Sequence, residues 1–114
     1  MSILYPYRRF RIGGRAVDLA NNGNPHWNVE SAVDAEKPVG QWNRLDLYAV
    51  GDKAIFVVNG VPVMALTDLA ALDARGKRVP LTHGRIQLQS EGAETFFRSI
   101  TVRPITKMPR LAPR

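Results

Sequence analysis

The feature that most constrains this chain of 114 residues is the dipeptide Asn59-Gly60, which lies between two runs of β-branched residues. The runs cover residues 54–58 and 61–66. A two-residue turn of type I′ needs positive φ at both central positions, and Asn-Gly adopts that geometry at least cost. The sequence therefore predicts a β-hairpin here.

The other segments follow the same period of two. Leu45 and Leu47 alternate with Arg44 and Asp46, as in a half-buried strand. Further strands are expected over 3–12, 15–20, 42–50, 84–90 and 95–105. Residues 69–75 predict one short helix, with Thr67 or Asp68 as its cap and Gly76 as its end.

This spacing of short strands predicts an all-β chain, folded as an antiparallel β-sandwich. A small open β-barrel is the alternative architecture. A single domain is expected over residues 1–106, followed by a basic tail over 107–114. The N-terminal forty residues have few strand signals, so the second sheet of the sandwich is expected to be incomplete.

The net charge of +6 is concentrated at the two ends of the chain. Residues 1–15 contain four arginines and residues 107–114 contain three basic residues, with no acid in either segment. The body, residues 16–106, has nine basic and ten acidic residues. A nucleic-acid-binding module usually carries its charge along a folded face among stacking aromatics. We therefore expect no nucleic-acid partner, with binding through the basic ends as an alternative.

Several other classes are excluded by what the sequence lacks. It has no cysteine, which excludes disulfides and thiol catalysis, and no apolar run of the length that spans a membrane. Its two histidines, His26 and His83, lie far apart, and no phosphate loop or dinucleotide fingerprint is present, so neither a metal nor a cofactor is expected. Residues 1–14 lack the apolar core of a secretory signal, which leaves the compartment open.

Aromatic and amide side chains provide the candidate binding residues. Trp27 lies in a loop near Glu30, where an exposed indole could stack on a sugar ring, although simple anchoring of the loop is the alternative. Gln87 and Gln89 share one face of their predicted strand. Trp42 opens a strongly alternating strand and is expected to pack between sheets. The candidate ligand-binding residues are Trp27, Glu30, His83, Gln87, Gln89 and Arg98; no catalytic residue is assigned.

Arg98 falls in register with apolar neighbours, including Phe96 and Ile100, which is an unusual position for a charge. Two explanations are open. Either a β-bulge turns the side chain away, or the guanidinium pairs with a carboxylate across the sheet.

Four strings occur in an order that resembles the C-terminal half of the 3-keto-disaccharide hydrolase domain. They are KPVGQWN at 37–43, VNGVPV at 58–63, GRIQLQSEG at 84–92 and FRSITVRPI at 97–105. The resemblance covers residues 37–105 and, more weakly, 5–36. Family members usually have Asn where this chain has Ser99. The family domain begins with additional strands that find no match here, so the chain is expected to enter the domain partway through.

The resemblance implies a concanavalin A-like jelly-roll sandwich and a carbohydrate partner, either a 3-keto sugar or an oligosaccharide. It also implies cleavage of glycosidic bonds in sugars oxidised at C3, or carbohydrate binding without chemistry, as in a lectin-like module. Oxidation at C3 acidifies the neighbouring C–H, so one well-placed base could eliminate the glycosidic oxygen. An exported location is compatible with this family.

The apolar rows of the predicted strands exceed what residues 1–36 are expected to cover. Leaving several such side chains in water would forfeit on the order of 10 kcal/mol, which is comparable to the stability of a small domain. We therefore predict a homo-oligomer, formed through a sheet face or an open edge strand.

Overall fold

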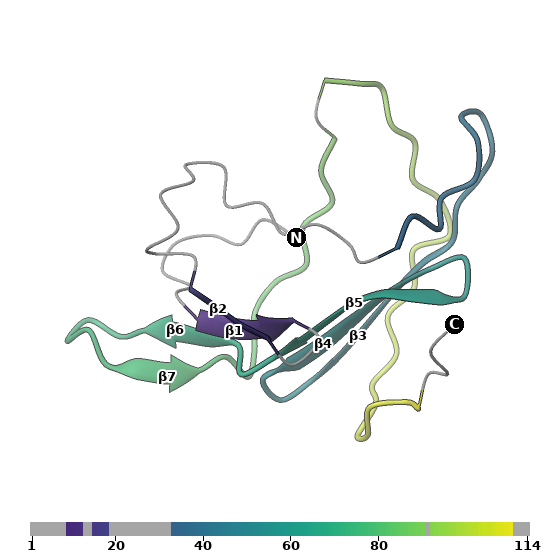
Figure 1. The fold of residues 1–114 in the computed structure, drawn as a ribbon. Helices are drawn as coiled ribbons and strands as arrows, with labels where there is room; N and C mark the ends of the chain where they lie inside the picture. The colour runs from purple at the N-terminus through teal and green to yellow at the C-terminus, as the bar shows by residue number, and fades with distance from the viewer. Residues whose placement is uncertain (1–8, 13–14, 19–32, 91, 111–114) are drawn as a thin grey trace.

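A computed structural model of the chain describes residues 9–12, 15–18, 33–90 and 92–110. Their core element is a five-stranded antiparallel sheet with the strand order β2-β1-β5-β4-β3 (Figure 1). A separate two-stranded hairpin joins β6 and β7. The strands are β1 Arg9–Ile12, β2 Arg15–Asp18, β3 Leu45–Val50, β4 Lys53–Val58, β5 Val61–Thr67, β6 Ala70–Leu72 and β7 Arg78–Pro80.

The predicted Asn59-Gly60 hairpin is confirmed. Val58 of β4 pairs with Val61 of β5, and the two residues between them have φ values of 50° and 80°. Both values lie in the left-handed region that a type I′ turn requires. Local sequence therefore determines this hairpin, which forms the centre of the sheet.

Three more predicted strands are confirmed in part. The strand expected over 42–50 begins at Leu45, and those expected over 3–12 and 15–20 appear as β1 and β2. Residues 3–8 and 19–20 lie outside the described residues. The five-stranded sheet is open, because β2 and β3 form its two edges and do not pair with each other. An open sheet rules out a closed barrel for this part of the chain.

One face of the sheet is covered by residues that flank the β6–β7 hairpin. Ala54 and Leu66, which are paired across β4 and β5, form the buried core with Leu69. The backbone N–H of Leu69 donates to the Asp52 carbonyl at the β3–β4 turn, and Leu81 donates to the Leu69 carbonyl. The first bond ties the start of the hairpin to the β3–β4 turn, and the second closes the base of the hairpin.

The helix expected over 69–75 is wrong. The segment forms β6 and the turn that leads to β7, closed by the Asp73 carboxylate, which accepts the backbone N–H groups of Arg75 and Lys77 at 2.9 Å each. Gly76, expected to end the helix, adopts φ 77° within this turn instead. A helix of two turns is unstable alone, whereas an Asx turn between paired strands satisfies the same backbone groups.

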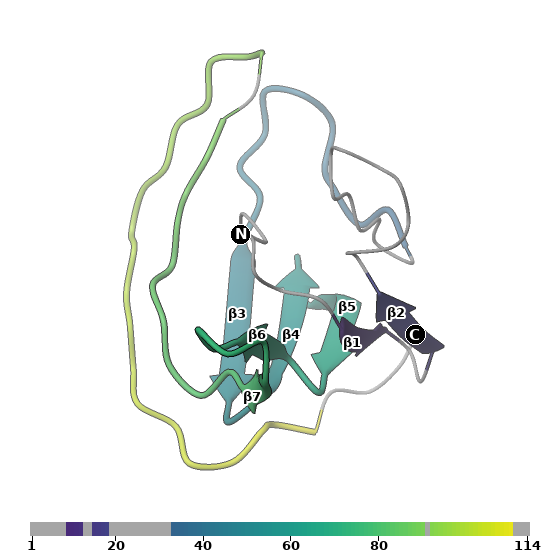
Figure 2. The same cartoon turned by 90° about the vertical axis from the view of Figure 1, so that its left-hand side faces the viewer.

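The strands expected over 84–90 and 95–105 are also wrong as β-strands. Both segments are extended, but neither pairs with another strand among the described residues (Figure 2). Their alternating pattern is present without the hydrogen-bonded ladder that would make them part of a sheet.

The described residues are all-β in class. They form no second sheet that packs against the first, so the jelly-roll sandwich stays a prediction, as do the domain bounds 1–106 and 107–114. Within the described ranges no helix is long and apolar enough to cross a membrane.

Candidate functional site

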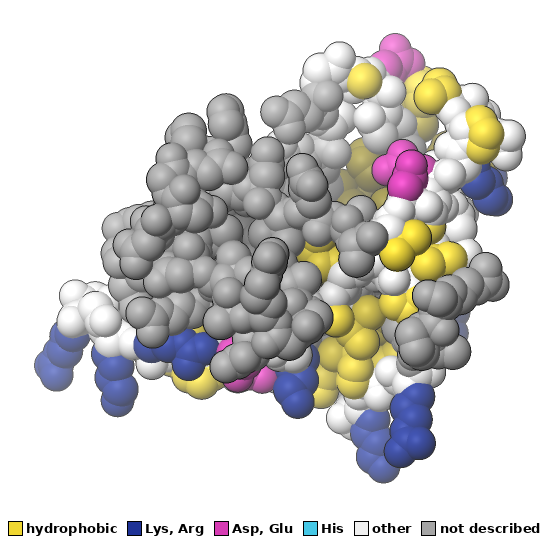
Figure 3. Space-filling view, viewed as in Figure 1, with side chains coloured by type: hydrophobic (Ala, Val, Ile, Leu, Met, Phe, Trp, Pro, Cys, Tyr) yellow, Lys and Arg dark blue, Asp and Glu magenta, His cyan; other side chains and the backbone are white. Residues whose placement is uncertain are grey.

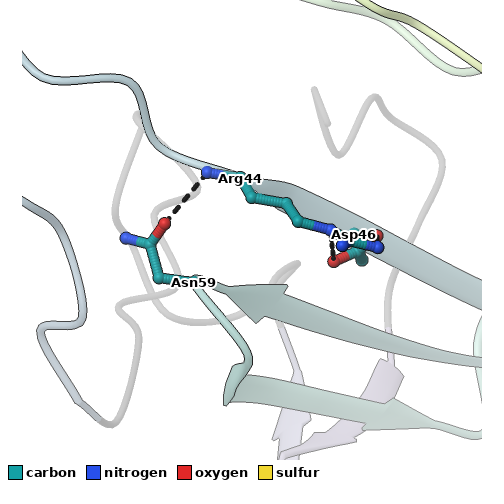
Figure 4. A network of polar contacts seen from close by, with 3 residues as sticks. All are labelled: Arg44, Asp46 and Asn59. Carbon is teal, nitrogen blue, oxygen red and sulfur yellow. Dashed lines mark hydrogen bonds and ion pairs between the residues drawn. The ribbon is translucent and has the colours of Figure 1, made fainter.

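The Asn59 side chain fastens the loop of residues 33–44 to the hairpin turn. Its Oδ1 accepts the backbone N–H of Arg44 at 2.9 Å, as Figure 4 shows. Its Nδ2 donates to the Ala35 carbonyl and to the Oδ1 of Asn43, both at 2.8 Å. The backbone N–H of Asn59 donates in turn to the Arg44 carbonyl at 2.9 Å. A turn residue thus also fixes the segment that leads into β3.

Asn43 extends this network into the loop, since its Oδ1 also accepts the backbone N–H of Lys37 at 2.8 Å. Between these residues the chain reverses in a tight turn, in which Gln41 donates to the Pro38 carbonyl at 3.2 Å. Gly40 has φ 91° at the third position of that turn, where a type II turn requires positive φ. The turn and the network together place Trp42.

Arg44 and Asp46 form an ion pair at the start of β3. The Nε of Arg44 lies 3.0 Å from one carboxylate oxygen, and its Nη2 lies 3.2 Å from the other. The hydrogen bond with Asp46 and the charge of its carboxylate raise the pKa of Arg44 above its ordinary value. Because Arg44 is exposed, screening by water makes this pair a weak contributor to stability.

Trp42 and Arg98 form a cation–π contact. The guanidinium carbon of Arg98 lies 3.9 Å from the centroid of the Trp42 ring, within the range of a cation–π interaction. Trp42 is 47% exposed, so the predicted packing between sheets is wrong for this residue. The contact joins the loop before β3 to the extended C-terminal segment.

A backbone kink follows Arg98 directly, because Ser99 has φ 54° in the left-handed region. A non-glycine residue there interrupts the alternation of an extended chain. Because this segment pairs with no other strand among the described residues, neither the bulge nor the cross-sheet carboxylate considered from the sequence is tested for Arg98. Its charge lies over an aromatic ring, and it forms no ion pair within the described residues.

The other predicted site residues are not brought together. His83, Gln87 and Gln89 are exposed on the extended segment after β7, and no hydrogen bond links them to another described residue. Trp27 and Glu30 lie outside the described residues. Among the residues described, no group of three or more His, Cys, Asp or Glu side chains could hold a metal ion.

Sequence reasoning missed the Asn43–Asn59 network. Its signal was available in part, because Asn43 follows Trp42 and Asn59 opens the hairpin turn. Each residue was interpreted through its own neighbours, whereas the hydrogen bond between their side chains joins positions 16 residues apart.

A family model described as a 3-keto-alpha-glucoside-1,2-lyase-like domain matches residues 3–103. No curated protein and no solved structure matches the chain. The family match spans most of the sequence, including the hairpin, the Trp42 loop and the segment that carries Arg98. It confirms the resemblance found from the four sequence strings. The chain therefore belongs to the family of 3-keto-alpha-glucoside-1,2-lyase-like domains.

Proposed function

We propose that this chain binds 3-keto glucosides, with Trp42 and Arg98 as part of the surface that contacts the sugar. Family membership makes the domain carbohydrate-related. The single observation that carries the location is the half-exposed indole of Trp42 with a guanidinium 3.9 Å from its ring centroid. An indole offers an apolar platform for a sugar ring, and a guanidinium donates hydrogen bonds to its oxygens.

The chemistry that the family description implies is an elimination. The C3 carbonyl acidifies the C2–H bond, so a general base can remove that proton. The electron pair of the broken C–H bond moves onto the C3 oxygen as an enolate and then forms the C1–C2 double bond. The C1–O bond breaks in that second step, and the glycosidic oxygen leaves and takes a proton back from the protonated base to become a hydroxyl. A guanidinium near the C3 oxygen would stabilise the negative charge that develops there.

Arg98 is suited to that task because its charge is held in place without a carboxylate partner in the described residues. A guanidinium paired with a carboxylate would have its donors occupied, whereas stacking on an indole face leaves the N–H groups at its edge free to point outward. His83, Gln87 and Gln89 stay in the proposal as further polar contacts to the sugar. The complete binding surface is proposed to lie on the jelly-roll sandwich that the family resemblance implies.

Binding is tested by calorimetric titration of the full chain with methyl 3-keto-α-glucoside, with methyl α-glucoside as the unoxidised comparison. Trp42→Ala is expected to weaken binding of the keto sugar at least about tenfold, which corresponds to losing about 1.4 kcal/mol. Val39→Ala is the matched control, because Val39 is fully exposed in the same loop and lies outside the proposed surface. Far-UV circular dichroism verifies that both variants keep the fold.

Turnover is measured in the same samples by release of methanol. Release of methanol supports a lyase activity, and binding without release of methanol supports a lectin-like module. A chain that binds neither sugar, or a Trp42→Ala variant that binds as tightly as Val39→Ala, contradicts the proposed surface.

A further inference from the structure

The β4–β5 turn brings together the two groups that react in the deamidation of asparagine. A backbone nitrogen that follows an asparagine can attack the side-chain carboxamide carbon, and a following glycine permits this best because it has no Cβ to block the approach. Asn59 is followed by Gly60, which is exposed at the tip of the turn. The closing hydrogen bond of a two-residue turn joins the flanking residues and does not use the N–H of the second turn residue. The Gly60 nitrogen is therefore a nucleophile next to a susceptible carboxamide.

The fold holds this carboxamide in place from another segment of the chain. Its Oδ1 accepts the backbone N–H of Arg44 at 2.9 Å (Figure 4), and its Nδ2 donates to the Ala35 carbonyl and to the Asn43 Oδ1, both at 2.8 Å. All three partners belong to the loop of residues 33–44. The attack by the Gly60 nitrogen closes a five-membered ring, for which the carboxamide must turn towards its own backbone. The three bonds to the loop resist that rotation.

The loop that supplies these bonds can leave the hairpin without unfolding the sheet. Every residue from 33 to 44 except Ala35 is exposed. The loop stands out from the sheet at the upper right of Figure 3. A segment with few buried contacts opens locally at a lower free energy than the whole fold. Each such opening releases the carboxamide of Asn59.

We propose that Asn59 is a deamidation site that the loop of residues 33–44 protects. When the loop opens, the Gly60 nitrogen gives up its proton to hydroxide and forms a bond to the Cγ of Asn59. The Cγ–Nδ2 bond breaks, Nδ2 takes up a proton and leaves as ammonia, and a succinimide ring remains. Water then adds to either carbonyl carbon of the ring and opens it, which gives aspartate or isoaspartate at position 59. Water is the only co-reactant.

Neither product can restore the bonds to the loop. The carboxylate of an aspartate has only acceptor oxygens, so the oxygen that replaces Nδ2 faces two other acceptors, the Ala35 carbonyl and the Asn43 Oδ1. Isoaspartate adds a methylene to the backbone, which does not fit a type I′ turn. A single deamidation therefore makes the release of the loop permanent. This inference does not depend on the proposed sugar-binding function.

The test follows deamidation of the full chain by mass spectrometry of the tryptic peptide 54–75, in which Asn59 is the only side-chain amide. The folded chain is expected to react at least about tenfold more slowly than the same chain in urea, in which the loop does not form. Asn43→Ala removes one acceptor of Nδ2 and is expected to raise the rate in the folded chain at least about threefold.

Two control variants separate release of the loop from a general loss of stability. Val39→Ala changes a fully exposed side chain of the same loop, and Ala54→Gly weakens the buried core at the far end of β4. Both folded variants are expected to deamidate at the rate of the original protein, and in urea all four chains should react alike. Circular dichroism verifies that each variant is folded before the incubation.

Equal rates in the folded and the urea-unfolded chain overturn the proposal, because the loop then gives no protection. The proposal is also overturned if Asn43→Ala leaves the rate of the folded chain unchanged. An increase with Ala54→Gly as large as that with Asn43→Ala overturns it as well, since the reaction would then follow unfolding of the whole chain.

Discussion

Replacing Asn59 by glycine removes the clamp between the hairpin and the loop of residues 33–44 while keeping the turn. Glycine adopts positive φ without strain, so the backbone at φ 50° is preserved. The three side-chain hydrogen bonds, to the Arg44 N–H, the Ala35 carbonyl and the Asn43 Oδ1, are lost. The variant therefore separates the contribution of the Asn59 side-chain hydrogen bonds from that of the turn conformation.

The magnitude follows from those three bonds. A hydrogen bond contributes about 0.5–1.5 kcal/mol net, and the lower half of that range applies here, because two of the three are exposed to water and only the bond to Ala35 is partly buried. We expect Asn59→Gly to lower the free energy of unfolding by about 1.5–3 kcal/mol. Asn59→Ala loses the same bonds and keeps a Cβ in the left-handed region without the polar side chain that lets Asn tolerate it, so it should cost about 1–2 kcal/mol more than Asn59→Gly.

The measurement is urea-induced unfolding followed by far-UV circular dichroism, at one protein concentration for all variants. With a slope of about 1–3 kcal/mol per molar urea, Asn59→Gly should shift the midpoint by on the order of 1 M. If Asn59→Gly is as stable as the original protein and only Asn59→Ala is destabilised, Asn59 serves the turn alone, and the inferred clamp is refuted.

Three further predictions follow from burial, backbone geometry and ring stacking. Leu66→Ala, at a residue 1% exposed, should cost about 2–5 kcal/mol in urea unfolding, whereas Leu45→Ala, at 65% exposure, should cost less than about 1 kcal/mol; equal costs would refute the assigned core. Ser99→Asn should raise stability by about 0.5–1 kcal/mol in thermal unfolding, because Asn tolerates φ 54° better than Ser, while Ser99→Thr should lower it; the opposite order would contradict the strained backbone. A double-mutant cycle of Trp42→Ala and Arg98→Ala should give a coupling of about 0.5–1 kcal/mol in urea unfolding, and additive effects would show that the stacking contributes nothing.

The sequence by itself determined the parts of this protein that depend on near neighbours. Asn59 and Gly60 each need positive φ in a type I′ turn, and their side chains permit it whatever surrounds them. Strand β3 likewise forms where the sequence alternates with a period of two, although its burial does not alternate, because Leu45 and Ala49 are exposed. The family could be recognised for the same reason, because its signature consists of short local strings in a given order.

Prediction from the local sequence failed where the same residues suit two different local structures. Leu69–Arg75 has a cap and a glycine stop that suit a short helix, yet it forms a hairpin strand and turn. Burial of Leu69 against Ala54 and Leu66 decided the outcome, together with the Asx turn at Asp73. The gain from covering the sheet exceeds the slight local preference for two turns of helix.

Only the tertiary structure decided the candidate site. Trp42 and Arg98 belong to two segments in which apolar and polar residues alternate in the same way. Nothing in the sequence of either segment indicates that these two residues meet. The Asn43–Asn59 bond likewise depends on where the loop returns to the hairpin. Contacts of this kind require the chain to bring distant residues within a few ångströms. That approach is set by the sheet topology and by the kink at Ser99, whereas the sequence pattern reports only what each residue prefers among its neighbours.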